Sequence, residues 1–135
     1  MRILVVDDNK VQRTALSMKL KGQGYDVLEA ADGSEAISIA RRVKLDLILL
    51  DIVFPPDVAH GGGVAWDGFL ILSWLRRQED ASNVPVIFIS GADAKNYEQH
   101  ALAAGAVKFF QKPVDNDQLL ATVREVLLPG KPDAR

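Results

Sequence analysis

The chain contains no cysteine, which excludes disulfide bonds and thiolate metal ligands. It also has no apolar run approaching the ~18 residues of a membrane-spanning helix. The segment before the first acidic pair, residues 1–6, is too short for a secretory signal peptide. The net charge of −2 gives no sign of a nucleic-acid-binding surface. These absences favour a cytoplasmic protein that binds neither membranes nor nucleic acid directly.

The size and composition are those of one globular domain. A chain of 135 residues is long enough to bury a sizeable core. Hydrophobic residues make up 48% of it and charged residues 25%, which argues against disorder. Residues 129–135 are rich in proline and polar side chains. We therefore expect a domain at 1–128, followed by a tail or the start of a linker at 129–135.

Two unbroken apolar runs lead directly into acidic residues. Residues 3–6 precede Asp7 and Asp8, and residues 47–50 precede Asp51. A short continuous apolar run is typical of a strand that is buried on both faces. In open parallel α/β sheets, ligands bind outside the carboxyl ends of the strands. The pattern therefore places these acids at a functional edge.

The remaining patterns alternate between strand and helix. This alternation predicts an α/β fold: a doubly wound, five-stranded parallel sheet in the flavodoxin-like order 2-1-3-4-5, with helices on both faces. In that order the crevice opens between the first and third strands. The later elements are expected as strands 26–30, 85–89 and 108–111 and as helices 68–77, 97–104 and 115–128.

The first two helices carry local signals of their own. After Asp8, Val11, Ala15 and Met18 recur at helical spacing as an apolar stripe, which Leu16 and Leu20 widen. Ser34 is the expected N-cap of the second helix.

The polar residues at the predicted edge suit phosphoryl transfer. Crowded carboxylates repel one another unless a cation is present, and oxygen ligands suit Mg²⁺. A carboxylate can attack phosphorus to form an acyl phosphate. The transferred group carries negative charge on its oxygens and needs cationic and hydrogen-bonding partners. Lys112 and Ser90, which end the fifth and fourth strands, supply an ammonium group and a hydroxyl group.

With this set of residues, the chain resembles the receiver domains of two-component response regulators, from Met1 to about Leu128. By that resemblance, Asp51 is the phosphoacceptor. Asp7 and Asp8 match the acidic pair that binds Mg²⁺, for which Mn²⁺ can substitute. Asp51 itself and the backbone carbonyl of Val53 complete the implied metal ligands.

The resemblance also implies a switch and its partners. Ser90 matches the switch hydroxyl, Lys112 the phosphate-binding lysine, and Phe109 the aromatic switch position. Asp51 would take a phosphoryl group from the phosphohistidine of a histidine kinase or a histidine phosphotransfer protein. Phosphorylation would alter a surface that binds a downstream output domain or protein. The resemblance leaves open whether the chain forms a homodimer. The implied role is a signalling domain that promotes its own phosphorylation and dephosphorylation, rather than a metabolic enzyme.

The sequence departs from the family pattern in several places. The loop 52–67 exceeds the usual length by roughly nine residues. The loop either controls access to the site, recognises a partner or shields the phosphate from water, or it is a tolerated surface insertion. Phe109 stands where tyrosine is more usual, and Ser90 where threonine is. The helix after the loop is apolar almost all round, which predicts that the loop or a second subunit covers Trp74.

Two other functions compete with this interpretation. A pseudo-receiver would keep the fold and act as a protein-interaction module without phosphate. A phosphohydrolase of the haloacid dehalogenase type also uses aspartyl phosphate, but it expects an Asp-x-Asp pattern after the first strand. Here Asp7 and Asp8 are adjacent, and the lone Asp51 follows the third strand.

Overall fold

The computed structural model describes residues 1–52, 68–77, 83–90, 99, 102–103, 105–112 and 114–127. For residues 51–52, 68–71 and 90 it describes the main chain alone. Val53, the rest of the expected long loop and the expected tail therefore lie outside the described residues.

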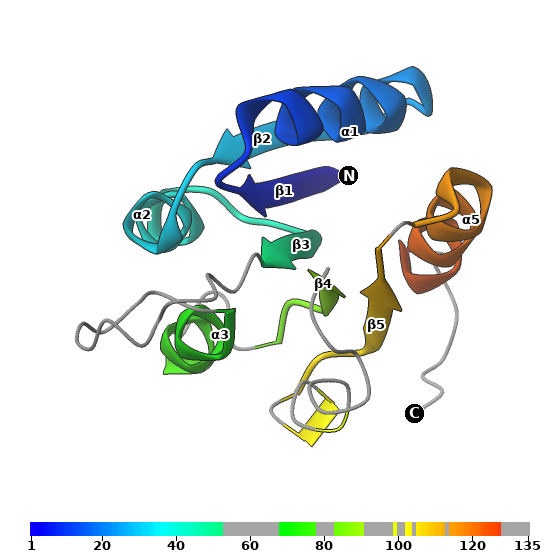
Figure 1. The fold of residues 1–135 in the computed structure, drawn as a ribbon. Helices are drawn as coiled ribbons and strands as arrows, with labels where there is room; N and C mark the ends of the chain where they lie inside the picture. The colour runs from blue at the N-terminus through cyan, green and yellow to red at the C-terminus, as the bar shows by residue number, and fades with distance from the viewer. Residues whose placement is uncertain are drawn as a thin grey trace.

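The sheet has five parallel strands in the order β2-β1-β3-β4-β5, as predicted (Figure 1). The third strand is central, and its unbroken apolar run, Leu47–Leu50, is typical of a strand covered on both faces of the sheet. The strands are β1 Arg2–Asp7, β2 Asp26–Ala30, β3 Leu47–Ile52, β4 Val86–Ser90 and β5 Lys108–Gln111.

Helices cover both faces of the sheet (Figure 1). The helices α1 (Lys10–Gly22) and α5 (Asn116–Leu127) lie on one face, and α2 (Gly33–Arg42) and α3 (Gly68–Arg77) lie on the other. In the segment 97–104, where a further helix is expected, the three described residues are helical. None of the helices in the described ranges is long and apolar enough to cross a membrane.

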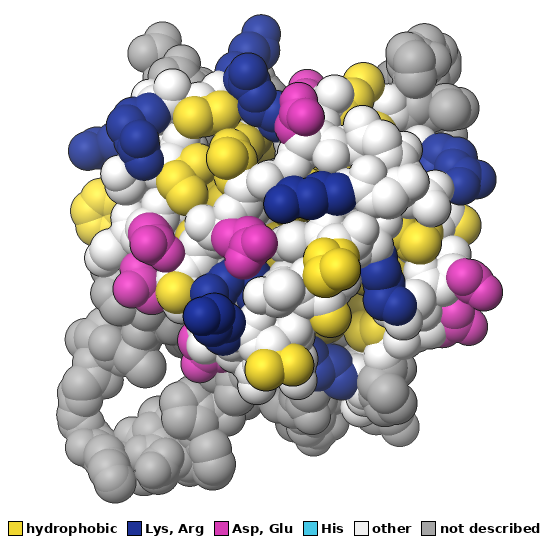
Figure 2. Space-filling model, turned by 90° about the horizontal axis from the view of Figure 1, so that it is seen from above, with side chains coloured by type: hydrophobic (Ala, Val, Ile, Leu, Met, Phe, Trp, Pro, Cys, Tyr) yellow, Lys and Arg dark blue, Asp and Glu magenta, His cyan; other side chains and the backbone are white. Residues whose placement is uncertain are grey.

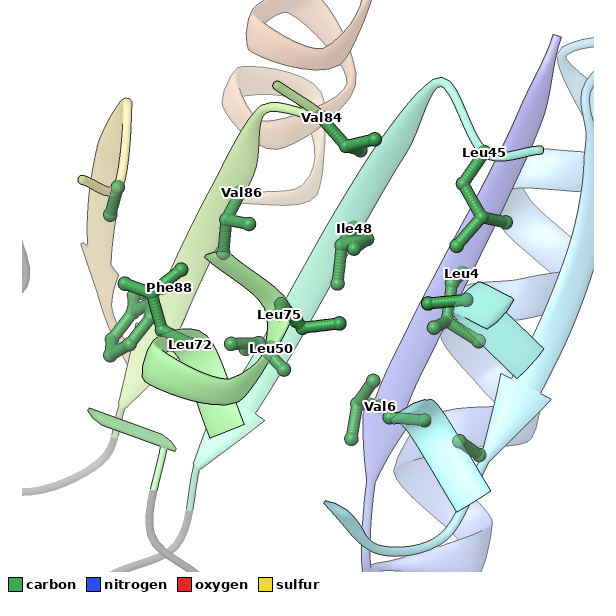
Figure 3. Close-up of a cluster of buried hydrophobic side chains, with 14 residues drawn as sticks. Leu4, Val6, Leu45, Ile48, Leu50, Leu72, Leu75, Val84, Val86 and Phe88 are labelled. Carbon is green, nitrogen blue, oxygen red and sulfur yellow. The ribbon is translucent and has the colours of Figure 1, made fainter. Parts of the chain in front are cut away.

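The core forms two layers because successive side chains of a strand point to opposite faces. One layer packs under α2 and α3, and Figure 3 shows its side chains. The other packs under α1 and α5. The strand residues of the first layer include Leu4, Val6, Ile48, Leu50, Val86 and Phe88. Those of the second are Ile3, Val5, Leu47, Leu49, Ile87 and Ile89.

Only part of the apolar stripe predicted on the first helix faces the core: Leu20 is fully buried and Leu16 packs against the core layer. Val11 is 78% exposed, Met18 is 66% exposed, and Ala15 is also exposed. The buried residues of α1 are Ser17 and Leu20. The core-facing side of α1 thus contains a polar residue beside Leu16 and Leu20, and the rest of the predicted stripe lies on the surface.

The N-cap of α2 is Asp32 and not Ser34, which lies inside the helix. The Asp32 side chain accepts a hydrogen bond from Glu35 N at 2.9 Å, and Glu35 Oε1 accepts one from Ala31 N at 2.6 Å. This reciprocal pair resembles a capping box, which satisfies two amide groups at once and so outcompetes a single serine.

Arg76 ties α3 to the two loops that lead into β4 and β5. Its Nη1 donates to Val84 O at 2.9 Å and its Nη2 to Gly105 O at 3.2 Å. Burial lowers the pKa of the Arg76 guanidinium group. Gly105 adopts a φ of +113°, a conformation that favours glycine.

We predict that Gly105→Ala lowers the free energy of unfolding by about 1–2 kcal/mol. The added Cβ would lie 3.3 Å from Arg76 Nε as well as in a disfavoured conformation. The matched control is Gly22→Ala in α1, where the added Cβ meets nothing within 4 Å. This change is expected to stabilise by about 0.5–1 kcal/mol. Urea unfolding measures both, and effects of the same sign would contradict the prediction.

Candidate functional site

The strand register gathers the predicted site residues at one edge of the sheet. Asp7 of β1 pairs with Asp51 of β3. Neighbouring strands lie about 4.8 Å apart, so the main chains of these two residues are adjacent. Ser90, the last residue of β4, pairs with Ile52 on one side and with Gln111 on the other.

The Asp7 carboxylate is buried and only half satisfied. Its side chain follows Ile3 and Val5 on the face toward α1 and α5, and the residue is 1% exposed. Oδ1 accepts a hydrogen bond from Asn9 N at 2.9 Å, whereas Oδ2 has no partner in the described part of the chain. A buried charged oxygen without a partner is costly. It suits coordination of a hard cation such as Mg²⁺.

The next acid in the chain, Asp8, is exposed. Asp7 and Asp8 together therefore offer one buried and one accessible carboxylate at the start of the β1–α1 connection. The described residues contain no group of three side chains placed to hold a metal ion. That search did not include the Asp51 side chain or Val53, which lie outside what the structure describes.

An arginine fixes the end of β1. Arg13 Nη1 donates to Asp7 O at 2.7 Å, and Arg13 Nε pairs with Glu29 Oε1 of β2 at 3.0 Å. The side chains of Arg13 and Glu29 are 14% and 33% exposed, so this pair is partly shielded from water. The main chain that carries Asp7 is therefore anchored to both α1 and β2.

Lys112 lies beside α1. Its Nζ donates to Gln12 Oε1 at 2.8 Å, although the two residues are 100 positions apart. Gln12 belongs to the first turn of α1, which is capped by Asn9 Oδ1 accepting from Gln12 N at 2.9 Å. Because α1 follows directly after Asp7 and Asp8, the ammonium group lies close to the acidic connection.

Phe109 is half-buried and packs against the core layer under α2 and α3. A side chain with this exposure has solvent on one side and core on the other. The structure thus places Asp7, Lys112 and Phe109 fully, and Asp51 and Ser90 by their main chain.

Three polar residues of the site were not predicted from the sequence: Gln12, Arg13 and Glu29. Gln12 and Arg13 lie one turn after the acidic pair, which is the only signal in the sequence that points to them. Glu29 carries no signal at all, because an acidic residue in an edge strand is ordinary surface composition.

Comparison with known proteins assigns most of the chain to one family. Residues 3–124 match the response regulator receiver domain. The chain is 32% identical over 126 residues to Protein PilH of Pseudomonas aeruginosa, covering 93% of this chain and 97% of PilH. It is 34% identical to the response regulator PleD of Caulobacter vibrioides, of which it covers only 26%.

Solved structures agree with this assignment. The chemotaxis protein CheY4 of Vibrio cholerae has a TM-score of 0.79 at 28% identity, covering 93% of this chain and 98% of that one. The receiver domain of the sensor histidine kinase PA1611 of Pseudomonas aeruginosa has a TM-score of 0.77 at 29% identity, covering 93% and 96%. That structure contains a magnesium ion coordinated in its active-site cleft. The chain therefore belongs to the response regulator receiver domain family and is a signalling domain of two-component systems.

Proposed function

We propose that Asp51 is the phosphoacceptor and that it takes a phosphoryl group from the phosphohistidine of a histidine kinase or phosphotransfer protein. The observation that supports this most is the pairing of Asp7 with Asp51 at the sheet edge that Lys112 borders. A buried, half-satisfied carboxylate beside the proposed nucleophile is more useful in metal binding than in stabilising the fold.

In the proposed reaction, a carboxylate oxygen of Asp51 attacks the phosphorus atom. The P–N bond to the donor imidazole breaks, its electron pair goes to the imidazole nitrogen, and that nitrogen is then protonated. An acyl phosphate forms on Asp51. Lys112 pairs with the phosphoryl oxygens, and the Ser90 hydroxyl donates a hydrogen bond to one of them.

Asp7, Asp8, Asp51 and the Val53 carbonyl would hold Mg²⁺, or Mn²⁺ in its place. Bound there, the ion supplies positive charge that offsets the carboxylates and the phosphoryl oxygens. Arg13 is a positioning residue for these ligands, because it donates a hydrogen bond to Asp7 O and so holds the Asp7 main chain in place. The proposal for this chain agrees with the magnesium ion found in the PA1611 receiver domain.

The proposed switch runs from Ser90 to Phe109. As Ser90 moves toward the phosphate, Phe109 rotates into the space it leaves, and the surface around β5 and α5 changes. The half-buried position of Phe109 supports this, because a ring already partly exposed can turn inward at low cost. A downstream output domain or protein reads the new surface.

The exposed stripe of α1 supports a docking site for the phosphodonor. Val11, Ala15 and Met18 expose apolar surface along α1, and Val11 is the chain neighbour of Gln12, which accepts a hydrogen bond from Lys112. Figure 2 looks onto the side where α1 lies and shows hydrophobic side chains exposed among charged ones. Apolar surface rimmed by charge is typical of a protein-binding site, and here it begins in the turn of α1 that carries Gln12, the partner of Lys112.

The proposed function is tested by intact-mass measurement after treatment with acetyl phosphate and Mg²⁺. We expect a gain of one phosphoryl group per chain, and no gain when EDTA replaces Mg²⁺. Molecular size measured before and after tests the homodimer that the sequence leaves open. Absence of any adduct under these conditions would favour the pseudo-receiver alternative.

We predict that Gln12→Glu slows phosphorylation by acetyl phosphate by roughly tenfold, or about 1.4 kcal/mol. The new carboxylate would pair with Lys112 and add negative charge next to the incoming phosphoryl group. The matched control is Gln118→Glu on the exposed surface of α5, which changes the net charge equally. Equal initial rates for the two variants would show that Gln12 does not act on Lys112.

The cytoplasmic location and the role of the loop 52–67 remain predictions. The haloacid dehalogenase alternative gains no support from the comparisons, because the matched family is the receiver domain.

A further inference from the structure

The face of the sheet opposite α1 carries a second exposed feature, between α2 and α3. A hollow of about 560 Å³ lies there, lined among the described residues by one face of α2 and by Trp74 of α3. The α2 residues recur at the spacing of a single helical face, with serine toward the N-terminus and arginine toward the C-terminus. They are Ser34, Ile37, Ser38, Arg41 and Arg42.

The C-terminal part of this face is strongly cationic. A second hollow of about 300 Å³ shares two arginines with the first and is lined, among the described residues, by Arg41, Arg42, Val43 and Lys44. The described lining residues of the two hollows include no aspartate or glutamate. This positive strip lies on a molecule whose net charge is −2, so it is a local concentration and not a general property of the surface.

Trp74 supplies an aromatic surface next to the arginines. It is 39% exposed, although the other large residues of its helix turn, Leu72 and Leu75, are fully buried. The Arg77 guanidinium group lies over the indole ring, 5.6 Å from its centroid. Within α2, Arg42 Nε donates a hydrogen bond to Ser38 O, one turn earlier, at 3.3 Å. These side chains are therefore arranged before any partner arrives.

Basic residues in the last turn of a helix also have a simpler role, since they offset the helix dipole. The last turns of α2 and α3 both carry arginine pairs of this kind. That role does not account for an exposed tryptophan stacked with one of the arginines. Tryptophan and arginine together are the residues that contribute most to binding at protein interfaces.

We propose that this α2–α3 strip docks an acidic segment of a partner protein. Carboxylates of the segment pair with Arg41 and Arg42, and an apolar side chain packs on Trp74 and Ile37. The proposal does not rest on the proposed phosphorylation of Asp51, because none of the described lining residues is a proposed site residue.

Two other occupants fit the observations less well. A second copy of the chain, paired about a twofold axis, would bring the same cationic strip against itself. A nucleic acid usually requires a longer row of phosphate contacts than these few cations provide, and the net negative charge would oppose it.

The test uses the fluorescence of Trp74 in the full chain with Trp66→Phe, which leaves one tryptophan. The probe is an amphipathic peptide of alternating glutamate and leucine. The control peptide has glutamine in place of every glutamate. We expect saturable binding of the acidic peptide that shifts the Trp74 emission. Arg41→Glu combined with Arg42→Glu should weaken this binding at least tenfold, and Arg41→Gln combined with Arg42→Gln should weaken it less.

The matched control combines Lys19→Glu and Arg124→Glu, which makes the same charge change in the last turns of α1 and α5. This variant should bind the acidic peptide with unchanged affinity. Equal binding of the glutamine peptide would overturn the proposal, as would the absence of any shift. Tighter binding of a single-stranded DNA oligonucleotide would assign the strip to nucleic acid instead. Self-association that the Arg41→Glu and Arg42→Glu changes abolish would assign it to a second copy of the chain.

Discussion

Asp51→Asn is expected to reduce phosphoryl labelling of the protein to background. The amide keeps the shape and the hydrogen-bonding capacity of the side chain but removes the nucleophilic carboxylate oxygen. Asp7 is not expected to substitute, because it is buried and its Oδ1 accepts a hydrogen bond from Asn9 N. The measurement is incorporation of phosphate from acetyl phosphate in the presence of Mg²⁺.

The matched control for this prediction is Asp46→Asn, which makes the same change next to the opposite end of β3. The Asp46 side chain accepts a hydrogen bond from Arg2 N at 2.8 Å, and an asparagine oxygen can accept the same bond. This variant should label like the unmodified chain. Full labelling of Asp51→Asn, with a normal far-ultraviolet spectrum, would remove Asp51 from the proposed role.

Asp7→Asn is expected to have two effects of opposite sign. Without divalent cations, the free energy of unfolding should rise by about 1–3 kcal/mol, because the buried Oδ2 has no described partner for its charge. Mg²⁺ affinity should fall at least tenfold, because the proposed metal site loses a carboxylate. If Asp7 served only to stabilise the fold, Asp7→Asn would lower the free energy of unfolding instead.

The same variant gives a direct measure of metal binding. A ligand at 100 times its Kd stabilises the native state by about 2.7 kcal/mol. Mg²⁺ should therefore raise the melting temperature of the unmodified chain and have little effect on Asp7→Asn, with Asp46→Asn behaving like the unmodified chain. Equal stabilisation of all three by Mg²⁺ would show that Asp7 is not a ligand.

The sheet could be predicted from the sequence because its signals are local. The run Leu47–Leu50 is apolar at every position, and each of these side chains is fully buried, as two helical layers require. The position of Asp7 and Asp51 at the carboxyl ends of β1 and β3 follows from the same pattern, since parallel strands end at the same edge. The pairing of Asp7 with Asp51 needed only the strand order.

The orientation of α1 could be predicted only in part, because Leu16 and Leu20 face the core and the other apolar residues of the predicted stripe do not. Its most regular apolar stripe, which includes Val11 and Met18, is exposed, because the inner side is set by Leu20 and by the contact of Arg13 with Asp7 O. The bond between Lys112 and Gln12 joins residues that no local pattern relates. The N-cap of α2 could have been predicted correctly as Asp32, because Asp32 and Glu35 have the spacing of a capping box.

The central claim is that a phosphoryl group is carried by the carboxylate at position 51. Borohydride reduces an acyl phosphate on aspartate to homoserine, so the modified residue can be located by peptide mass mapping after treatment with acetyl phosphate and Mg²⁺. The account predicts homoserine at position 51 and unchanged aspartate at positions 7 and 8. Homoserine at either of those two positions, or at none of the three in protein that has gained a phosphoryl group, would contradict it.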